Sequence, residues 1–323
     1  MILAVDIGGT RTRLAWFEPQ RLRYPRHLRQ YMTTEIRTLL QLLHDYSKEV
    51  GLWPSAVAIG VAGPVVGGRS FTVNLPWVVD AQELRDCFRI PHVAVLNDLE
   101  AAAYGIALLE EHDCCSLQAG VPGARGNQAV LAAGTGLGEA GLYWDGSTHH
   151  PFATEGGHAT FSPSNETEDA LSVWLRAEFG HVSWERVLSG PGLVNIYRFL
   201  QRQNRLPGSG KQESPHDTAP SPEAIAAAAQ KGDAACQAAL QMFCRLYGAE
   251  AANLALKLMA TGGVFIAGSI AVQNLDFFKR GEFISAFRNK GRMRPLLEAI
   301  PVRVVLVEEL VLLGAARYAS LVP

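Results

Sequence analysis

The sequence predicts an α/β protein with two related halves. Short apolar runs typical of buried strands alternate with helical patterns along the chain, which is the signature of this class. A strand, a Gly/Thr turn and a second strand occur near Gly8 and again near Gly134. The chain has 323 residues, enough for two domains at roughly 150 residues each.

Composition and charge exclude several classes of protein. With 48% hydrophobic and 19% charged residues, the chain can bury enough apolar surface to fold, unlike a disordered protein. The formal net charge is −2 and no Lys/Arg block interrupts the balance. We therefore expect neither nucleic acid nor an anionic membrane as a partner.

The chain shows no sign of export or membrane insertion. Asp6 breaks the first apolar run too early for a secretory signal. Leu254–Val272 is apolar, but Lys257 and Gly262-Gly263 divide it, which predicts a helix end, a tight turn and a buried strand rather than a span. The cysteines form no CxxC or Cys/His ligand set, so we expect core packing in a reducing, cytoplasmic compartment. They are Cys87, Cys114, Cys115, Cys236 and Cys244.

In the first half, a hairpin precedes alternating helices and strands. Ile2–Ile7 and Thr12–Phe17 flank Gly8-Gly9-Thr10, as two strands around a Gly-rich turn. Thr34 is the predicted cap of a helix whose apolar face recurs with helical period; that face holds Ile36, Leu39, Leu40 and Leu43. The expected elements after it are strands Val57–Val61 and Val93–Leu96 and helix Leu99–Glu111.

The second half begins with the repeated hairpin pattern, Gln128–Ala133 and Leu137–Trp144 around Gly134-Thr135-Gly136. Arg202–Pro222 has the composition of a loop. Ser221-Pro222 then predicts a helix start, a Ser cap followed by Pro in the first turn. The remaining expected elements are a helix break at Gly232-Asp233, a long helix to Met259, strands Val264–Ala267 and Val302–Val307, and helix Leu310–Leu321.

The two glycine turns are candidate phosphate sites. Without a Cβ, the backbone N–H groups of Gly8-Gly9-Thr10 can approach an anion closely. Asp6 just before them suits a hydrated Mg²⁺ beside phosphate. Gly134-Thr135-Gly136 offers the same chemistry, and two such turns could clamp one polyphosphate between two domains. Each turn alone is equally compatible with an ordinary β-turn, and neither matches a P-loop or a Rossmann motif.

Asn97 and Asp98 follow a buried strand, at the edge where α/β sheets present catalytic groups. The spacing of Asn97 and Glu100 fits a capping box, so Asn97 is expected to cap the next helix. Asp98 would then lie in the first helical turn and point into a cleft. Because the helix dipole favours a carboxylate there, we expect Asp98 to stay ionised and to accept a hydroxyl proton.

Three further segments have weaker signals. Glu155-Gly156-Gly157-His158 suits hydrogen bonding to a polyol, or is a flexible turn with a surface histidine; zinc is not expected, because further ligands are missing. Trp184–Gly192 indicates little beyond helix, turn and helix. Gly262–Ser269 is a buried strand that exits into a Gly/Ser turn, where a flat base could lie.

In this order the motifs resemble the bacterial glucokinase family of the hexokinase and actin-like ATPase superfamily. They are DIGGTRTR (6–13), LNDLEAAAYG (96–105), AAGTGLG (132–138), EGGHATFSP (155–163), GHVSWERVLSGPGLVNIY (180–197), GGVFIAGS (262–269) and LLGAA (312–316). The resemblance implies a two-domain actin-like ATPase (ribonuclease H-like) fold with a cleft between a small and a large domain. The small domain would span 1–108, rejoined by 308–323, and the large domain 109–307.

The resemblance also implies ATP-dependent phosphorylation of glucose at the 6-hydroxyl, with Mg²⁺ and a homodimer. Asp98 matches the general base, and the sugar ligands match Asn74, Asn97, Asp98, Glu155, His158 and Glu185. The ATP side matches Asp6, through water to Mg²⁺, the phosphate cradle Gly8, Gly9, Thr10, Thr135 and Gly136, and the adenosine contact Gly268.

Two residues depart from the family pattern and leave alternatives open. Glu139 stands where a small or apolar residue is usual, and strand alternation predicts that it points outward. Ser269 replaces a glycine of the adenosine-side turn. The alternatives are a kinase for another hexose or amino sugar and a catalytically silent sugar-binding regulator. A regulator would be expected to lose the base or the phosphate glycines, and Asp98, Gly8 and Gly136 are all present.

Overall fold

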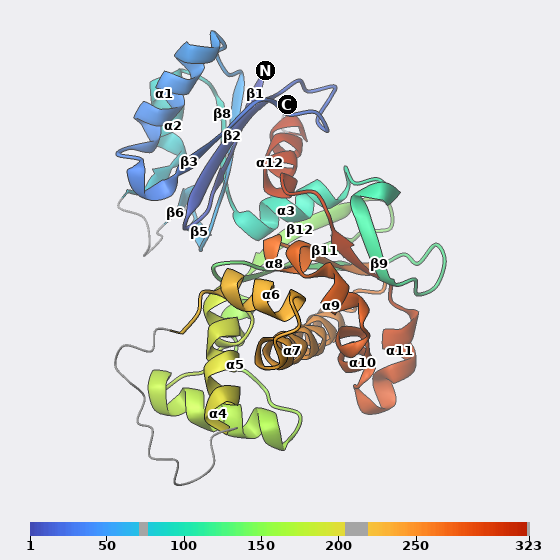
Figure 1. The fold of residues 1–323 in the computed structure, drawn as a ribbon. Helices are drawn as coiled ribbons and strands as arrows, with labels where there is room; N and C mark the ends of the chain where they lie inside the picture. Colours follow the sequence, from blue (N-terminus) through green and yellow to red (C-terminus); the bar gives the residue numbers. More distant parts are fainter. Residues whose placement is uncertain (71–76, 204–218, 322–323) are drawn as a thin grey trace. The chain divides into compact units, whose positions relative to one another are not determined.

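The computed structural model describes the chain except for residues 71–76, 204–218 and 322–323. It is an α/β protein whose chain forms two compact units (Figure 1). The first unit contains residues 1–114, 139–155 and 306–323, and the second contains residues 115–138 and 156–305. Residues 139–155 therefore group with the first unit, whereas the sequence-based division puts them in the larger domain.

A five-stranded sheet organises the first unit, in the order β3-β2-β1-β4-β8. Strands β1, β2 and β3 are antiparallel neighbours, and β4 and β8 continue the sheet in parallel with β1. The strands are β1 (Ile2–Ile7), β2 (Arg11–Phe17), β3 (Arg26–Met32), β4 (Ala56–Val61) and β8 (His92–Asn97). The predicted hairpin and the two predicted strands after it are confirmed, and the structure shows that these two strands are parallel to β1.

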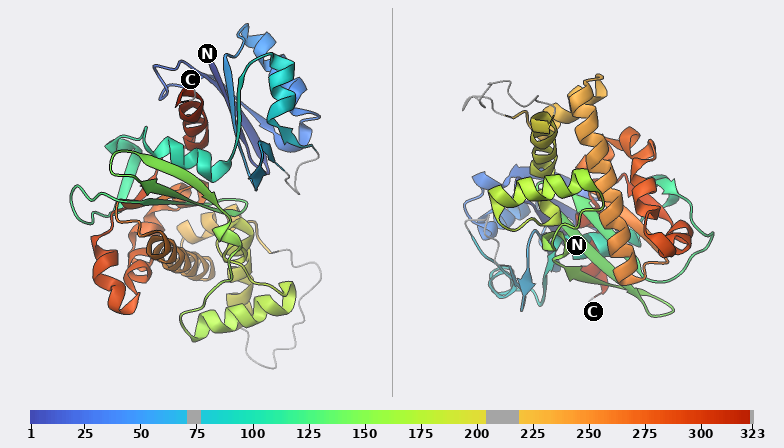
Figure 2. Two further views of the ribbon diagram at one scale, coloured as in Figure 1. Left: turned by 180° about the vertical axis from the view of Figure 1, so that it is seen from behind. Right: turned by 90° about the horizontal axis from the view of Figure 1, so that it is seen from below.

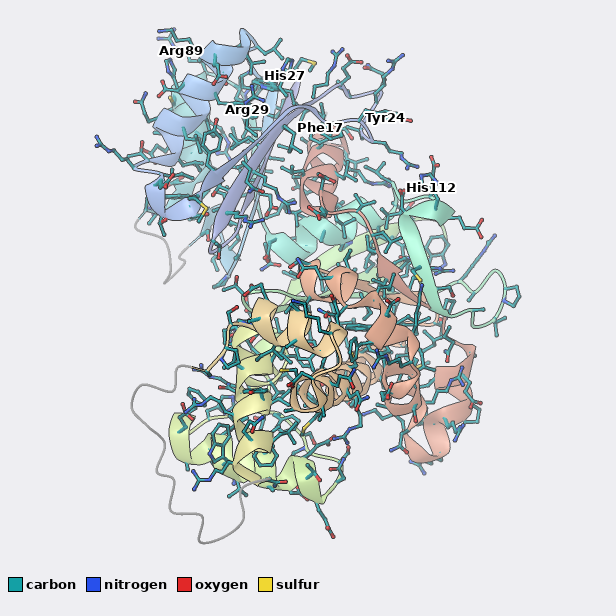
Figure 3. The ribbon with its side chains drawn as sticks, viewed as in Figure 1. Phe17, Tyr24, His27, Arg29, Arg89 and His112 are labelled. Atoms are coloured by element: carbon teal, nitrogen blue, oxygen red, sulfur yellow. The ribbon has the colours of Figure 1, made fainter. Side chains whose placement is uncertain are left out.

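Strand β3 was missed by the sequence analysis. It lies at the sheet edge and is exposed along almost its whole length, so it carries no apolar alternation. His27 and Arg29 belong to this edge, and Tyr24 precedes it (Figure 3). The Tyr46 hydroxyl donates to the carbonyl oxygen of His27 at 2.5 Å, which ties the edge strand to a helix beneath it.

Helices cover both faces of this sheet (Figure 1). Helices α1 (Leu39–Val50) and α2 (Ala81–Phe88) bury one face, and α12 (Leu310–Leu321) buries the other beside α3 (Asp98–Ile106). Alternate residues of β1 belong to the two cores, so every residue of the strand is buried. A continuous apolar run is the pattern expected of a strand covered on both sides.

Helices α3 and α12 approach each other through glycine. A Cβ built on Gly314 would collide with the carbonyl oxygen of Ala101, and one on Gly105 would lie 2.5 Å from the carbonyl oxygen of Leu310. Glycine at these two positions therefore permits the close crossing. The same crossing holds the helix that begins with Asp98.

Two predicted helix boundaries in this unit are wrong. The cap of α1 is Thr38, whose side chain accepts from the Gln41 N–H, and Thr34 lies in a short 3₁₀ turn, η1 (Thr33–Glu35). Helix α3 ends at Ile106 rather than at residue 111. The Asp113 carboxylate accepts from the Glu110 N–H at 2.8 Å, and this bond closes a separate turn, η2 (Glu111–Asp113).

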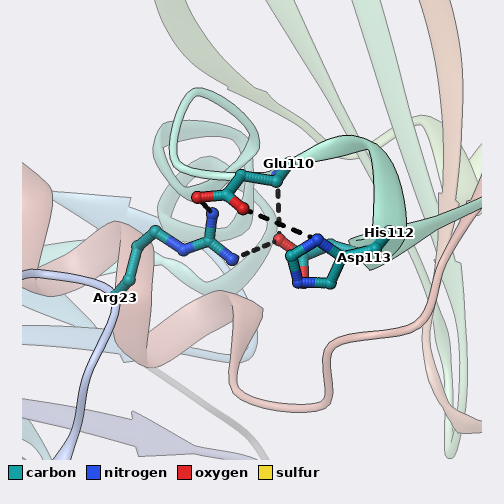
Figure 4. Close-up of polar contacts among 4 residues, drawn as sticks. All are labelled: Arg23, Glu110, His112 and Asp113. Carbon is teal, nitrogen blue, oxygen red and sulfur yellow. Dashed lines mark hydrogen bonds and ion pairs between the residues drawn. The ribbon is translucent and has the colours of Figure 1, made fainter.

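An ion-pair cluster lies where the chain first leaves the first unit and where it last re-enters it (Figure 4). The Arg23 guanidinium pairs with Glu110 and, at 2.8 Å, with Asp113. His112 lies within 3.5 Å of both carboxylates. The Asp113 carbonyl accepts from the Leu306 N–H at 2.8 Å. One cluster thus joins the β2–β3 loop to the first and the last of the four crossings, at residues 114/115 and 305/306.

The second unit contains parallel strands that pack against a long helix, α7. Its strands follow the order β10-β13-β14-β9, and β13 pairs in parallel with β10 and β14. Helix α7 lies between α5 and α10 (Figure 2). These elements are β9 (Cys114–Gln118), β10 (Gln128–Ala133), β13 (Gly263–Ala267), β14 (Val302–Val305), α5 (Gly190–Gln203), α7 (Ala234–Leu258) and α10 (Glu282–Arg288).

The remaining elements are short or peripheral. In the first unit, β5 (Val65–Val66), β6 (Arg69–Ser70) and β7 (Val79–Asp80) form a small antiparallel sheet. Strand β11 (Leu137–Trp144) starts in the second unit, continues in the first and pairs there with β12 (His149–Thr154). The second unit adds η3 (Gly156–His158), α4 (Glu166–Phe179), η4 (Trp184–Arg186), α6 (Pro222–Gln230), α8 (Ser269–Gln273), α9 (Leu275–Lys279), η5 (Gly291–Met293) and α11 (Arg294–Ala299).

Most predictions for the second half are confirmed. Both strands around Gly134–Gly136 have the predicted bounds, and Ser221 caps α6 with Pro222 in its first turn. The last strand ends at Val305, two residues early. Most of the predicted loop at Arg202–Pro222 lies outside the described residues. Among the described residues, no helix is both long and apolar enough to cross a membrane.

The prediction for the cysteines is correct for two of them. Cys236 and Cys244 are buried on α7, but Cys87 is exposed and Cys114 and Cys115 are half-buried. All five lie within the described part of the chain and none forms a disulfide.

Candidate active site

The first glycine turn joins β1 to β2, and two of its carbonyl groups accept hydrogen bonds from Thr33. Thr33 donates from its hydroxyl to the Gly8 carbonyl at 2.9 Å, and from its N–H to the Thr10 carbonyl at 3.0 Å. Around Gly9 a Cβ would meet no heavy atom within 4 Å. The turn is therefore held by hydrogen bonds through its carbonyls and is open around Gly9, which leaves room for close approach of a phosphate.

Asp6 lies at the end of β1 and pairs with an arginine that the sequence analysis did not assign. Arg13 donates to Asp6 Oδ2 from Nε at 3.1 Å and from Nη2 at 2.7 Å. Burial raises the pKa of the Asp6 carboxyl, and the Arg13 charge opposes that shift. The hairpin register places Asp6 opposite Arg13, so the pairing could have been inferred from the turn position.

Asp98 is the first residue of α3, as predicted. The Asn97 side chain caps the helix: its Oδ1 accepts from the N–H groups of Leu99 at 2.9 Å and Glu100 at 3.2 Å. Its amide nitrogen donates to the Gly63 carbonyl at 3.1 Å. These bonds fix the backbone from which the Asp98 side chain extends.

The expectation that Asp98 stays fully ionised is wrong. Desolvation by burial, followed by the nearby negative charges of Asp6 and Glu155, raises its pKa to about 7. The Leu99 N–H, which donates to Asp98 Oδ1 at 2.9 Å, opposes this shift only in part. Loss of hydration thus outweighs the stabilisation of a carboxylate at a helix N-terminus. Two carboxyl groups of the first unit, Asp6 on β1 and Glu155 after β12, therefore lie near enough to Asp98 to act on its charge.

The second glycine turn joins β10 to β11 and is held by hydrogen bonds within the turn and to α5 and α7. The Gly134 N–H donates to the Gly136 carbonyl at 2.8 Å, and the Gly190 N–H donates to the Gly134 carbonyl at 2.8 Å. The Ala133 N–H donates to the Tyr247 hydroxyl at 3.1 Å. Thr135 at the tip is exposed. Gly190 and Tyr247 could not be predicted as partners, since nothing in the sequence places α5 and α7 at this turn.

Gly268 lies against the start of the same turn. Its φ is +90°, and a Cβ there would lie 2.6 Å from the Ala133 carbonyl oxygen. A side chain is therefore excluded on both backbone and steric grounds. Ser269 is exposed as the first residue of α8.

Two segments of the second unit that carry predicted sugar residues meet at Leu137. A Cβ on Gly157 would collide with the Leu137 carbonyl oxygen, which places the η3 turn and His158 beside β11. Glu185 Oε2 accepts from the Leu137 N–H at 3.0 Å. His158, Glu185 and the Gly134–Gly136 turn therefore lie in one region of the second unit.

Each unit contains part of the predicted set. In the first unit these are Asp6, Gly8, Gly9, Thr10, Asn97, Asp98 and Glu155, and in the second Thr135, Gly136, His158, Glu185 and Gly268. The prediction for Asn74 lies outside the described residues. The prediction that Glu139 points outward is wrong, because this residue is only 1% exposed. Most of β11 is buried on both faces, so alternation does not expose every second residue.

Comparisons of sequence and of structure both find glucokinases similar to this chain. A family model described as Glucokinase matches residues 3–322. A glucokinase of Nostoc punctiforme is 36% identical over 339 residues, covering 99% of both chains. The crystal structure of a glucokinase from an Antarctic psychrotroph has a TM-score of 0.83 at 29% identity, covering 98% of both chains. A ROK family glucokinase from Streptomyces griseus, in complex with glucose and AMPPNP, shares the fold at a TM-score of 0.67, 23% identity and 98% coverage of both chains.

Proposed function

This chain belongs to the glucokinase family, and from that premise we propose that it transfers the γ-phosphoryl group of ATP to the 6-hydroxyl of glucose. The products are glucose 6-phosphate and ADP. The observation that carries the proposal is Asp98, a carboxyl with a pKa near 7 held at the start of α3. ATP with Mg²⁺ and a homodimer complete the proposal on the strength of family membership.

Asp98 is the proposed general base. As the glucose O6 attacks the γ-phosphorus, its proton moves to the Asp98 carboxylate, the O6–P bond forms, and the bond to the ADP oxygen breaks. A base whose pKa lies near the working pH is well matched to this task. Phosphoryl transfer has a loose transition state, so the other residues act mainly by positioning the substrates and stabilising charge.

The remaining roles follow the contacts around each residue. Asn97 is buried and already holds Leu99, Glu100 and Gly63, so it serves first to position Asp98 and offers its remaining amide N–H to the sugar. The other proposed sugar ligands are Asn74, Glu155, His158 and Glu185. The two glycine turns are the proposed contacts for the phosphates, and Gly268 for the adenosine.

The residues around Asp6 fit a hydrated Mg²⁺. Both Arg13 bonds end on Oδ2, so among the described residues Oδ1 accepts none. An acidic oxygen beside an open glycine turn matches the ion's preference for carboxylates, waters and substrate phosphates. When bound, Mg²⁺ neutralises charge on the transferred phosphoryl group. Arg13 fixes the orientation of the Asp6 carboxylate.

A coupled assay of ADP formation tests the proposed function. With Mg²⁺ and ATP, we expect turnover on glucose to exceed that on mannose, fructose and N-acetylglucosamine, because a site built for one set of hydroxyls leaves polar groups unpaired with another. Faster turnover on another sugar would reassign the acceptor. Sugar binding by calorimetry without turnover, with ADP and polyphosphate also tried as donors, would support the silent regulator instead.

The pH dependence of kcat/KM tests the state of Asp98. Its carboxyl must be deprotonated to accept a proton, and its pKa is raised to about 7. We therefore expect kcat/KM for glucose to rise with pH through about pH 7 and to fall about tenfold per unit below it. A steady-state profile with the coupling enzymes in excess measures this. An acid limb near pH 4, the ordinary range of a carboxyl, would contradict the assignment.

A further inference from the structure

Glu185 contacts the glycine turn proposed to bind phosphate. Its Oε2 accepts a hydrogen bond from the Leu137 N–H, directly after Gly136. A Cβ built on Gly136 would collide with the same oxygen. The Glu185 carboxylate therefore occupies the space beside the end of the turn, and glycine at 136 leaves room for it.

The segment that carries Glu185 also holds the start of the turn. Five residues later, the Gly190 N–H donates to the Gly134 carbonyl at 2.8 Å. Ser189 braces the segment, because its hydroxyl donates to the Glu185 carbonyl at 2.7 Å and accepts from the Gly192 N–H at 3.0 Å. The 185–192 segment is thus hydrogen-bonded to the Gly134–Gly136 turn at both ends.

The hydrogen bond from the Leu137 N–H to the Glu185 carboxylate belongs to a strong class. A backbone N–H that donates to a carboxylate makes a charge-assisted hydrogen bond, roughly twice as strong as one between neutral groups. Glu185 is half-buried, so water replaces this bond less readily than on an open surface. Among the described residues, only Oε2 of the carboxylate is engaged, which leaves Oε1 for a sugar hydroxyl.

We propose that Glu185 is a positioning residue for the ATP phosphates as well as a sugar ligand, acting through the Leu137 N–H on the Gly134–Gly136 turn. The inference rests on the proposed function, which assigns that turn to the phosphates. It makes one carboxylate common to both substrates, so that nucleotide affinity depends on a residue of the sugar site.

Calorimetry with AMPPNP and Mg²⁺, in the absence of sugar, tests this role. We expect Glu185→Ala to weaken AMPPNP binding about tenfold, since the turn loses a charge-assisted bond. Glu185→Gln keeps an acceptor oxygen for the Leu137 N–H, so AMPPNP affinity should return to within about threefold of wild type. Glucose affinity should stay reduced in both variants: with the Gln oxygen bonded to the Leu137 N–H, its NH₂ group faces the sugar hydroxyl in place of the acceptor Oε1.

His158→Ala is the matched control. It removes another proposed sugar ligand of the same unit, and it should weaken glucose binding while leaving the Kd for AMPPNP unchanged. Wild-type AMPPNP affinity in Glu185→Ala would overturn the inference and leave the proposed function intact. Failure of the wild-type chain to bind AMPPNP at all would overturn the proposed function, and this inference with it. Should Glu185→Ala fail to fold, Glu185→Asp retracts the carboxylate by one methylene and should shift AMPPNP binding in the same direction.

Discussion

Replacing Asp98 with asparagine is expected to lower kcat by about 10²- to 10⁴-fold, the usual contribution of a general base. Asparagine has the same shape, and its Oδ1 can still accept from the Leu99 N–H that now bonds to Asp98. The start of α3 should therefore be preserved. The variant should still bind glucose, with a loss of affinity much smaller than the loss of kcat, because its amide can hydrogen-bond to the sugar but cannot take up the proton.

Steady-state kinetics gives kcat, and calorimetry gives the glucose Kd of the same preparation. Asp80→Asn is a matched control, since Asp80 caps α2 in the same unit, with its Oδ1 accepting from the Gln82 N–H at 2.8 Å. This control should keep the wild-type kcat. An Asp98→Asn enzyme with near wild-type kcat would show that the proton goes elsewhere.

Replacing Gly314 with alanine is expected to destabilise the fold by about 3 kcal/mol, at the upper end of the usual cost of overpacking. The added methyl group would meet the Ala101 carbonyl oxygen, which belongs to backbone and cannot rotate away. Helices α3 and α12 would have to separate along their whole contact. Urea unfolding followed by circular dichroism measures the change in the free energy of unfolding.

Ser320→Ala provides the comparison on the same helix. The Ser320 side chain is exposed and bonds locally to the Arg317 carbonyl at 2.7 Å, so the change should stay within about 0.5 kcal/mol. A Gly314→Ala protein as stable as this control would show that the α3–α12 crossing tolerates a wider spacing. Because α3 begins with Asp98, we also expect Gly314→Ala to lower kcat.

Local sequence signals predicted the elements that depend on local chemistry. β10 and β11 match their predicted bounds because a glycine turn separates two apolar runs, and α6 because a Ser-Pro pair starts it. β3 could not be predicted in this way. Its place in the sheet comes from pairing with β2, while its own side chains face water. The α1 cap was assigned to Thr34 rather than Thr38, since Ile36 continues the apolar period of the helix although it lies before its start.

Motifs supplied the candidate site residues but not their surroundings. The position of Asp98 on α3 follows from sequence, whereas its pKa depends on burial and on carboxylates brought near by folding. Glu139 shows the same limit, since strand alternation cannot reveal that both faces are covered. The contact of Glu185 with the Leu137 N–H joins residues 48 positions apart, and no spacing rule predicts it.

The placement of α12 has a consequence for synthesis on the ribosome. This helix covers the sheet face formed by Ile2, Ala4, Ala15 and Phe17, yet it is made about 200 residues after β8. At bacterial or eukaryotic elongation rates of roughly 5–20 residues per second, that face waits about 10–40 s for its partner. During this interval the nascent sheet exposes an apolar surface, which makes it a natural client for chaperones that shield such surfaces. The first unit to emerge is thus the last to be completed.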